Sequence, residues 1–198
     1  MVYSRNVEDR ELTFGVSGLV YKNNLLMYDH QTESLWLQVK NAAVTGPMTG
    51  STLTVLPSTL TTWKKWRKAH PDTVVLSENT GYNRDYSRDP YADYYESRRS
   101  IFGFARRILQ GHEAKGLVAG IQLEDSSMAY PMDMLRERQK IVERIDGKTV
   151  TLALNPETNR LSIKDDTGAD IPFIITYWFV WKNIHSQSGR YKADTSAP

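Results

Sequence analysis

The chain has 198 residues, of which 40% are hydrophobic and 24% charged, and this composition excludes disordered, collagen-like and low-complexity proteins. Its 25 Lys and Arg residues nearly balance its 23 Asp and Glu residues, so the molecule as a whole has no strong field to attract nucleic acid or acidic lipid. Cysteine is absent, which removes thiol nucleophiles, disulfides and Cys-ligated metal sites. We expect a single domain over residues 1–188 and a flexible tail over 189–198.

Membrane insertion and export are not expected from the residues present. No apolar run approaches the roughly 18–20 residues that a transmembrane helix needs, and the polar start of the chain does not resemble a signal peptide. We therefore expect no membrane partner, and a cytoplasmic location for the chain as it stands.

The first 56 residues predict a hairpin and two further strands. Two apolar runs, 12–21 and 25–29, flank the short polar turn at 22–24, a pattern typical of a hairpin. The run 34–39 predicts a strand that ends before the Gly and Pro residues of 46–50. The alternating run 52–56 predicts a strand with one buried face.

A short helix is predicted over residues 61–69, ended by His70 and Pro71. Thr59, Thr61 or Thr62 would cap it. Its two tryptophans are three residues apart, which favours a buried face with Lys and Arg on the solvated side. The same residues also fit a stacking surface for single-stranded nucleic acid, but the near-neutral net charge argues against it, and we expect no nucleic-acid partner. A strand is predicted over 73–77.

The second half of the chain predicts mainly strands. We expect a strand over 117–123, a short helix from Pro131 to Glu137, and a meander of strands over 141–145, 149–154 and 160–163. The apolar run 173–181 fits either a buried strand or a helix. The fold class is therefore α+β, a mainly antiparallel β meander or partly closed sheet with a few short helices.

The segment 78–100 has no regular pattern and carries the strongest candidate for binding. Its tyrosines combine flat apolar rings with hydroxyl groups, its arginines can clamp an acid, and its aspartates can accept hydrogen bonds from hydroxyls or bind a cation. A small polar ligand or a peptide fits this chemistry. The alternative is a loop packed on its own side chains. The candidate ligand-binding residues of the chain are Asp29, Trp36, Tyr82, Arg84, Asp85, Tyr86, Tyr91, Tyr94 and His185.

Catalytic and metal motifs are not found in the sequence. The four histidines show no paired ligand spacing, the aspartates do not follow a calcium-loop pattern, and neither Gly-x-Ser-x-Gly nor Ser-x-x-Lys occurs. We assign no catalytic residue, metal or cofactor, and whether the chain is an enzyme stays open.

Several stretches together resemble one uncharacterised prokaryotic family, the domain of unknown function 3179. The stretches that carry the resemblance are 14–18, 27–29, 31–36, 46–50, 63–71, 75–77, 80–82, 84–91, 129–131 and 178–181. The resemblance implies a portion before Met1 with a Cys-Pro-x-Cys-like motif, in some members with selenocysteine, and relatives that often look exported. It therefore implies a second reading, in which this chain is the substrate-cradling part of a thiol or selenol oxidoreductase.

Two departures from the family pattern affect what the resemblance implies. The family tends to show an aromatic-His-Pro sequence after its Trp pair, whereas this chain has Ile184-His185-Ser186. The family also repeats a strand-and-helix unit, of which only one copy, Gly120 to Pro131, is visible here. A missing copy would expose a strand edge, so we expect a homo-oligomer or a partner that covers it.

Overall fold

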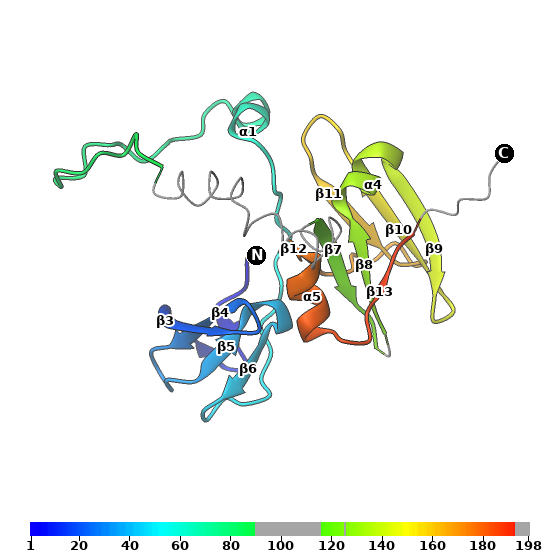
Figure 1. Ribbon diagram of the computed structural model, residues 1–198, viewed down its shortest axis with the longest axis horizontal. Coiled ribbons are helices and arrows are strands. Elements are labelled where there is room, and N and C mark those ends of the chain that lie inside the picture. The colour runs from blue at the N-terminus through cyan, green and yellow to red at the C-terminus, as the bar shows by residue number, and fades with distance from the viewer. Residues whose placement is uncertain (90–115, 125, 193–198) are drawn as a thin grey trace, which may run out of the picture.

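The computed structural model describes residues 1–89, 116–124 and 126–192. These residues form mostly antiparallel sheets and three short α-helices, with no closed barrel among them, which confirms the α+β class. No helix within the described ranges is long and apolar enough to cross a membrane. Figure 1 shows two groups of strands, one from each half of the chain, with a helix between them.

The N-terminal half forms a four-stranded antiparallel sheet. In spatial order its strands are β3 (Phe14–Tyr21), β4 (Asn24–Asp29), β5 (Leu35–Leu37) and β6 (Ala42–Thr45). The tip of the first hairpin, Lys22 and Asn23, has φ angles of 48° and 63°, as a two-residue turn between twisted strands requires. The predicted hairpin is confirmed. A small ribbon of β1 (Asn6–Val7) and β2 (Arg10–Glu11) precedes the sheet, and the 3-10 helix η1 (Gln38–Lys40) interrupts it.

Two predicted strands do not form. Residues 52–56 make only isolated bridges, Thr52 to Ala42 of β6 and Val55 to Tyr3. Strand β6, beside β5, was not predicted. Residues 73–77 have no neighbouring strand in the described residues, and Val74 is 93% exposed. A strand without a partner leaves its backbone groups unpaired, so β propensity alone does not form one.

The C-terminal half contains two more sheets. Strands β9 (Lys140–Ile145), β10 (Lys148–Leu154) and β11 (Leu161–Lys164) form the predicted meander, which is confirmed. The second sheet has the order β12 (Phe173–Tyr177), β7 (Leu117–Gln122), β8 (Ser127–Pro131) and β13 (Gly189–Arg190). Strand β13 pairs parallel to β8, so the first two residues of the predicted tail belong to a sheet.

Three helices complete the described fold. Helix α1 (Trp63–Ala69) begins after Thr62, whose hydroxyl accepts a hydrogen bond from the backbone N–H of Lys65. Helix α4 (Met132–Arg138) follows Pro131, as predicted, and α5 (Trp178–Ile184) continues directly from β12. The apolar run 173–181 is thus a strand and then a helix. The prediction that α1 buries its tryptophans is wrong, because Trp63 is 51% exposed and α1 has no buried residue.

The two halves meet where α5 packs on both. Val39 of η1 shares a core cluster with β7, β8, β12 and α5, among them Val118 and Trp181. A side chain at Gly120 would place its Cβ 2.4 Å from the Trp181 ring, so glycine permits the close approach of α5 to β7. Separate clusters fill the N-terminal sheet and the space between the two C-terminal sheets.

A buried carboxylate organises the N-terminal sheet. Asp29, at the end of β4, has no exposed surface and accepts hydrogen bonds from the Trp36 indole N–H (2.8 Å) and the Thr32 hydroxyl (2.8 Å). Burial alone would raise the pKa of Asp29, but the hydrogen bonds from Trp36, Thr32 and Ser34 outweigh it and lower this pKa. The carboxylate therefore stays charged in the interior and joins β4 to β5.

We expect Asp29→Asn to lower the free energy of unfolding at pH 7 by about 2 kcal/mol, because an amide NH2 group would meet a donor where the carboxylate accepts. Since the pKa of Asp29 is lowered on folding, its contribution is present above about pH 4 and is lost as the pH falls through the lower folded value. Urea unfolding at pH 7 and pH 3 measures both effects.

Exposed Asp9 provides the matched control, and Asp9→Asn should leave both quantities close to wild type. An Asp29→Asn variant as stable as wild type at pH 7 would contradict a structural role for this carboxylate.

Candidate ligand-binding groove

A groove of about 880 Å³ lies between α1 and the edge of the C-terminal sheets. One wall consists of residues 55–61 and one side of α1, and the other of residues 160–163 and 170–173. Ligand sites in proteins commonly have volumes of about 300–1,000 Å³. The groove is therefore large enough to hold a small organic molecule or several residues of an extended chain.

Two hydrogen bonds across a long sequence separation hold the walls in place. The Lys65 ammonium donates to the backbone carbonyl of Pro156 (2.7 Å), and the Asn159 side chain donates to the carbonyl of Leu60 (3.1 Å). Both connect the start of α1 to the turn between β10 and β11. The position of α1 is thus fixed by a turn more than 90 residues away in sequence.

The α1 wall presents an aromatic surface. The Trp66 ring lies 4.1 Å from the His70 ring, centroid to centroid, and its indole N–H donates to the Thr73 hydroxyl (3.0 Å). These contacts restrain the orientation of the indole, which lines the groove while remaining 37% exposed. Leu56 lines the same wall, and Ile171 and Phe173 line the opposite one. Both walls can therefore contact an apolar ligand.

Polar groups without partners accompany the apolar walls. The Thr61 hydroxyl is buried and has no hydrogen-bond partner in the described structure. Arg160 lines the groove, and no ion pair in the described residues involves its guanidinium. Buried hydroxyls are normally satisfied, so the unpaired Thr61 is a feature that a ligand would explain.

Strand β11 also offers backbone groups to the groove. The Ile163 carbonyl accepts a hydrogen bond from the N–H of Ile171 (2.8 Å), so the backbone of Ile163 faces away from β10. Because backbone direction alternates along a strand, the N–H and carbonyl of Leu161 face the same way. Pro172 has no N–H to continue the pairing. Among the described residues, this edge of β11 is paired at Ile163 with Ile171 and at Lys164 with Asp170, and Leu161 continues the edge beside the groove.

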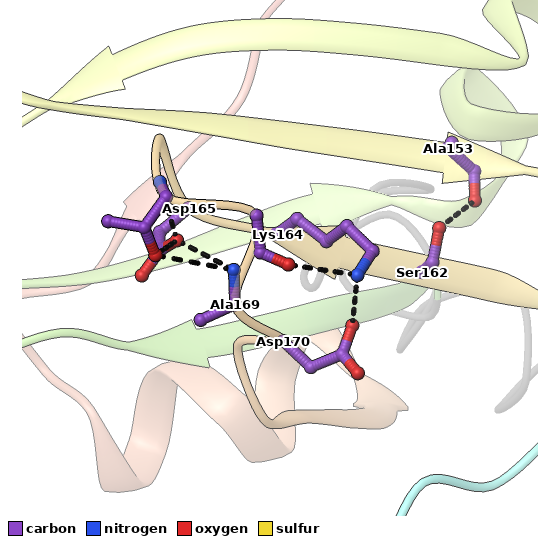
Figure 2. Close-up of polar contacts among 8 residues, drawn as sticks. Ala153, Ser162, Lys164, Asp165, Ala169 and Asp170 are labelled. Carbon is purple, nitrogen blue, oxygen red and sulfur yellow. Dashed lines mark hydrogen bonds and ion pairs between the residues drawn. The ribbon is translucent and has the colours of Figure 1, made fainter.

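A turn after β11 fixes the segment that closes this edge (Figure 2). The Lys164 ammonium lies 3.0 Å from the Asp170 carboxylate and donates to the carbonyl of Gly168 (3.0 Å). The Asp165 carboxylate accepts hydrogen bonds from Thr167 and from the N–H of Ala169, and these bonds, led by the Thr167 hydroxyl, lower the pKa of Asp165. Asp170, which lines the groove, is thus already paired with a cation.

A second cavity, of about 480 Å³, lies where the two halves of the chain meet. Val39, Lys40 and Asn41 line one side, and β7 and α5 line the other. The His185 ring stacks on Trp181 with the centroids 4.0 Å apart, and its Nε2 lies 3.4 Å from the carbonyl oxygen of Val39. Burial lowers the pKa of His185 more than the Val39 hydrogen bond raises it, and the charge of Lys40 lowers it further.

The structure separates the residues that the sequence analysis grouped as ligand-binding. Asp29 and Trp36 are fully buried and bonded to each other, so neither faces solvent. Among those of these residues that the structure describes, only His185 lines one of the two cavities. The groove itself was missed, because its walls come from segments about 100 residues apart; the one sequence signal was the pair Trp63 and Trp66.

The described part of the Tyr-rich segment lies outside both cavities. Tyr82, Arg84, Asp85 and Tyr86 are exposed, and the segment extends away from both groups of strands (Figure 1). Two hydrogen bonds between its described side chains are local: Tyr86 with Thr80 (2.6 Å), and Ser87 with Asp85 (2.6 Å), the latter lowering the pKa of Asp85. Tyr91 and Tyr94 lie outside the described residues.

The chain belongs to the family described as protein of unknown function (DUF3179), whose model matches residues 1–170. This confirms the resemblance over most of the chain, while the Trp178–Trp181 stretch lies beyond the matched residues. No curated protein and no solved structure matches the chain. The family assignment therefore carries no activity, and the function must be argued from the residues.

We expect the stability of the junction to depend on pH through His185. Because its pKa is lowered on folding, protonation favours the unfolded chain, and the free energy of unfolding should fall as the pH drops below about 6.5. His185→Phe keeps a ring on Trp181 but does not titrate, so it should lose less stability between pH 7.5 and 5.5. Denaturant unfolding at the two pH values measures the difference. His30→Phe, at an exposed histidine, should keep the wild-type pH dependence, and an identical dependence in His185→Phe would contradict the assignment.

A further prediction separates the two readings of the Tyr-rich segment. Since Tyr86 and Arg84 are exposed, the double variant Arg84→Ala/Tyr86→Ala should change the free energy of unfolding by less than about 0.5 kcal/mol. A thermal melt tests this. A drop of several degrees in Tm would favour the internally packed loop instead.

Proposed function

We propose that this protein is a binding module whose groove holds an elongated ligand with an apolar body and an acidic group. The observation that carries the proposal is the groove between α1 and β11, where aromatic and aliphatic walls accompany a buried hydroxyl without a partner. An enzyme would need, in addition, a nucleophile or an acid–base pair within the groove. The features described above, apolar walls with a hydroxyl and a cation, support recognition of a ligand.

The apolar part of the ligand would lie between Trp66 and Phe173. Both side chains line the groove from opposite walls, and burying an apolar ligand surface contributes about 25 cal/mol per Å². The restrained indole of Trp66 favours binding, because little side-chain entropy remains to be lost when a ligand arrives. A flexible hydrocarbon or an extended apolar side chain fits this arrangement.

The acidic part of the ligand would lie near Arg160. A guanidinium binds a carboxylate through two parallel N–H donors, and the Thr61 hydroxyl can donate to the same kind of oxygen. Two other charged groups of the groove already have partners: Lys65 the Pro156 carbonyl, and Asp170 the Lys164 ammonium. Selectivity for an acid over an amine or an alcohol should therefore depend on Arg160.

The Tyr-rich segment and the oxidoreductase reading stay predictions of the sequence. Tyr82, Arg84, Asp85 and Tyr86 do not line the groove, so a role in binding would need a ligand or peptide that reaches beyond it. A redox role would need sulfur or selenium from another polypeptide segment, since this chain has no cysteine. No structural feature favours that role over binding.

Decanoate is a suitable probe, because it combines a ten-carbon chain with a carboxylate. We expect wild-type protein to bind decanoate in isothermal titration calorimetry. Trp66→Ala should weaken binding about tenfold through lost apolar contact. Arg160→Gln should weaken decanoate binding by a similar factor through the lost charged hydrogen bond, but should leave the binding of decanol unchanged.

Trp63→Ala is the matched control, because Trp63 lies on the same helix but does not line the groove. It should bind decanoate as wild type does. Equal losses in Trp63→Ala and Trp66→Ala, or no decanoate binding at all, would contradict the proposed site.

A further inference from the structure

Helix α1 has a second face that the groove does not use. Lys65, Trp66, Ala69 and the following His70 line the groove. At 100° per residue these side chains occupy one half of the helix circumference. The remaining residues project from the opposite half, and we call them the outer face of α1: Trp63, Lys64, Arg67 and Lys68.

The outer face concentrates positive charge in a molecule that is nearly neutral overall. Three of its four residues are cations, and no Asp or Glu occurs between Glu33 and Asp72. No ion pair in the described residues involves Lys64, Arg67 or Lys68, and all three are exposed. Because salt screens charges beyond about 8–10 Å, a surface in contact with α1 responds to this cluster and not to the net charge of +2.

Exposed apolar side chains occur on the outer face and in the stretch that follows α1. Trp63 on the outer face is 51% exposed, and the aliphatic residues of the stretch after α1, Val74, Val75 and Leu76, are 93%, 68% and 91% exposed. In Figure 1 the chain after α1 leads away from both groups of strands. Solvent-exposed aliphatic residues in sequence are unfavourable in water and indicate an interaction surface.

We propose that the outer face of α1 and residues 74–76 dock on the surface of a bilayer that contains anionic lipid. Lys and Arg are attracted to anionic headgroups, Trp favours the membrane–water interface, and short aliphatic segments insert at the acyl boundary. Charge complementarity thus identifies the partner, and the aliphatic residues distinguish it from nucleic acid, which would use cations and stacked rings but gains little from Val74 and Leu76. This inference is independent of the ligand proposed for the groove.

The test is flotation of the whole protein with vesicles. Vesicles of phosphatidylcholine with about 30% phosphatidylglycerol should carry the protein upward, whereas vesicles of pure phosphatidylcholine should carry much less. We expect the triple variant Lys64→Glu/Arg67→Glu/Lys68→Glu to lower partitioning to the anionic vesicles more than about tenfold. Val75→Asp should lower it about tenfold as well, since a charge there opposes insertion.

A matched control reverses three exposed cations elsewhere. Lys22→Glu/Lys140→Glu/Lys192→Glu changes the net charge by the same amount and should keep most of the vesicle binding. Circular dichroism melts check that every variant is folded, and none of the substituted side chains is buried.

Three results would overturn the proposal. They are no flotation of wild-type protein, an equal loss in the control triple variant, and vesicle binding that Val75→Asp leaves unchanged. Fluorescence anisotropy with single-stranded DNA at the same salt concentration tests the competing partner. The surface would be assigned to nucleic acid if the protein did not float with vesicles but bound DNA, and if this binding depended on the three cations and not on Val75.

Discussion

Both proposed surfaces depend on how the start of α1 is tied to the turn between β10 and β11. The bonds from Lys65 to Pro156 and from Asn159 to Leu60 are the contacts that set the distance between helix and sheet. A helix of seven residues is too short to be stable in isolation, and α1 buries none of its own side chains. The position of α1 therefore depends on these bonds and on the Thr62 cap. The groove on one side of α1 and the outer face on the other depend on the same contacts.

Much of the fold could be predicted because the signals were local. Turns such as Lys22-Asn23 and Asp146-Gly147 need positive φ angles at neighbouring positions, which all four residues adopt. Such turns determine hairpin register without help from distant segments. The meander over β9, β10 and β11 follows from the same local rule. The capped start of α1 was also predictable, since Thr62 precedes the first helical residue.

What could not be predicted depended on partners elsewhere in the chain. Residues 52–56 have a strand pattern, but they pair with β6 only through the bridge from Thr52 to Ala42. The weakly patterned Ala42–Thr45 gave no clear signal for β6. The spacing of Trp63 and Trp66 is typical of a buried helix face, yet Trp63 is 51% exposed. Periodicity shows which residues share a face but not what lies against it. For the same reason Asp29 and Trp36 were predicted to lie at a binding surface, whereas in the structure the buried Trp36 indole donates a hydrogen bond to the buried Asp29 carboxylate.

The two surfaces of α1 are also related by the chemistry of their partners. An elongated molecule with an apolar body and an acidic group is an amphiphile, and amphiphiles concentrate at bilayers because each buried CH2 group contributes about 0.8 kcal/mol. A protein that takes such a ligand meets more of it at the membrane surface than in water. Because the outer face and the groove lie on opposite sides of one helix, docking through the outer face leaves the groove lining uncovered. The side chains of a single short helix would thus bring the protein to a surface where its ligand is enriched and still hold that ligand against β11.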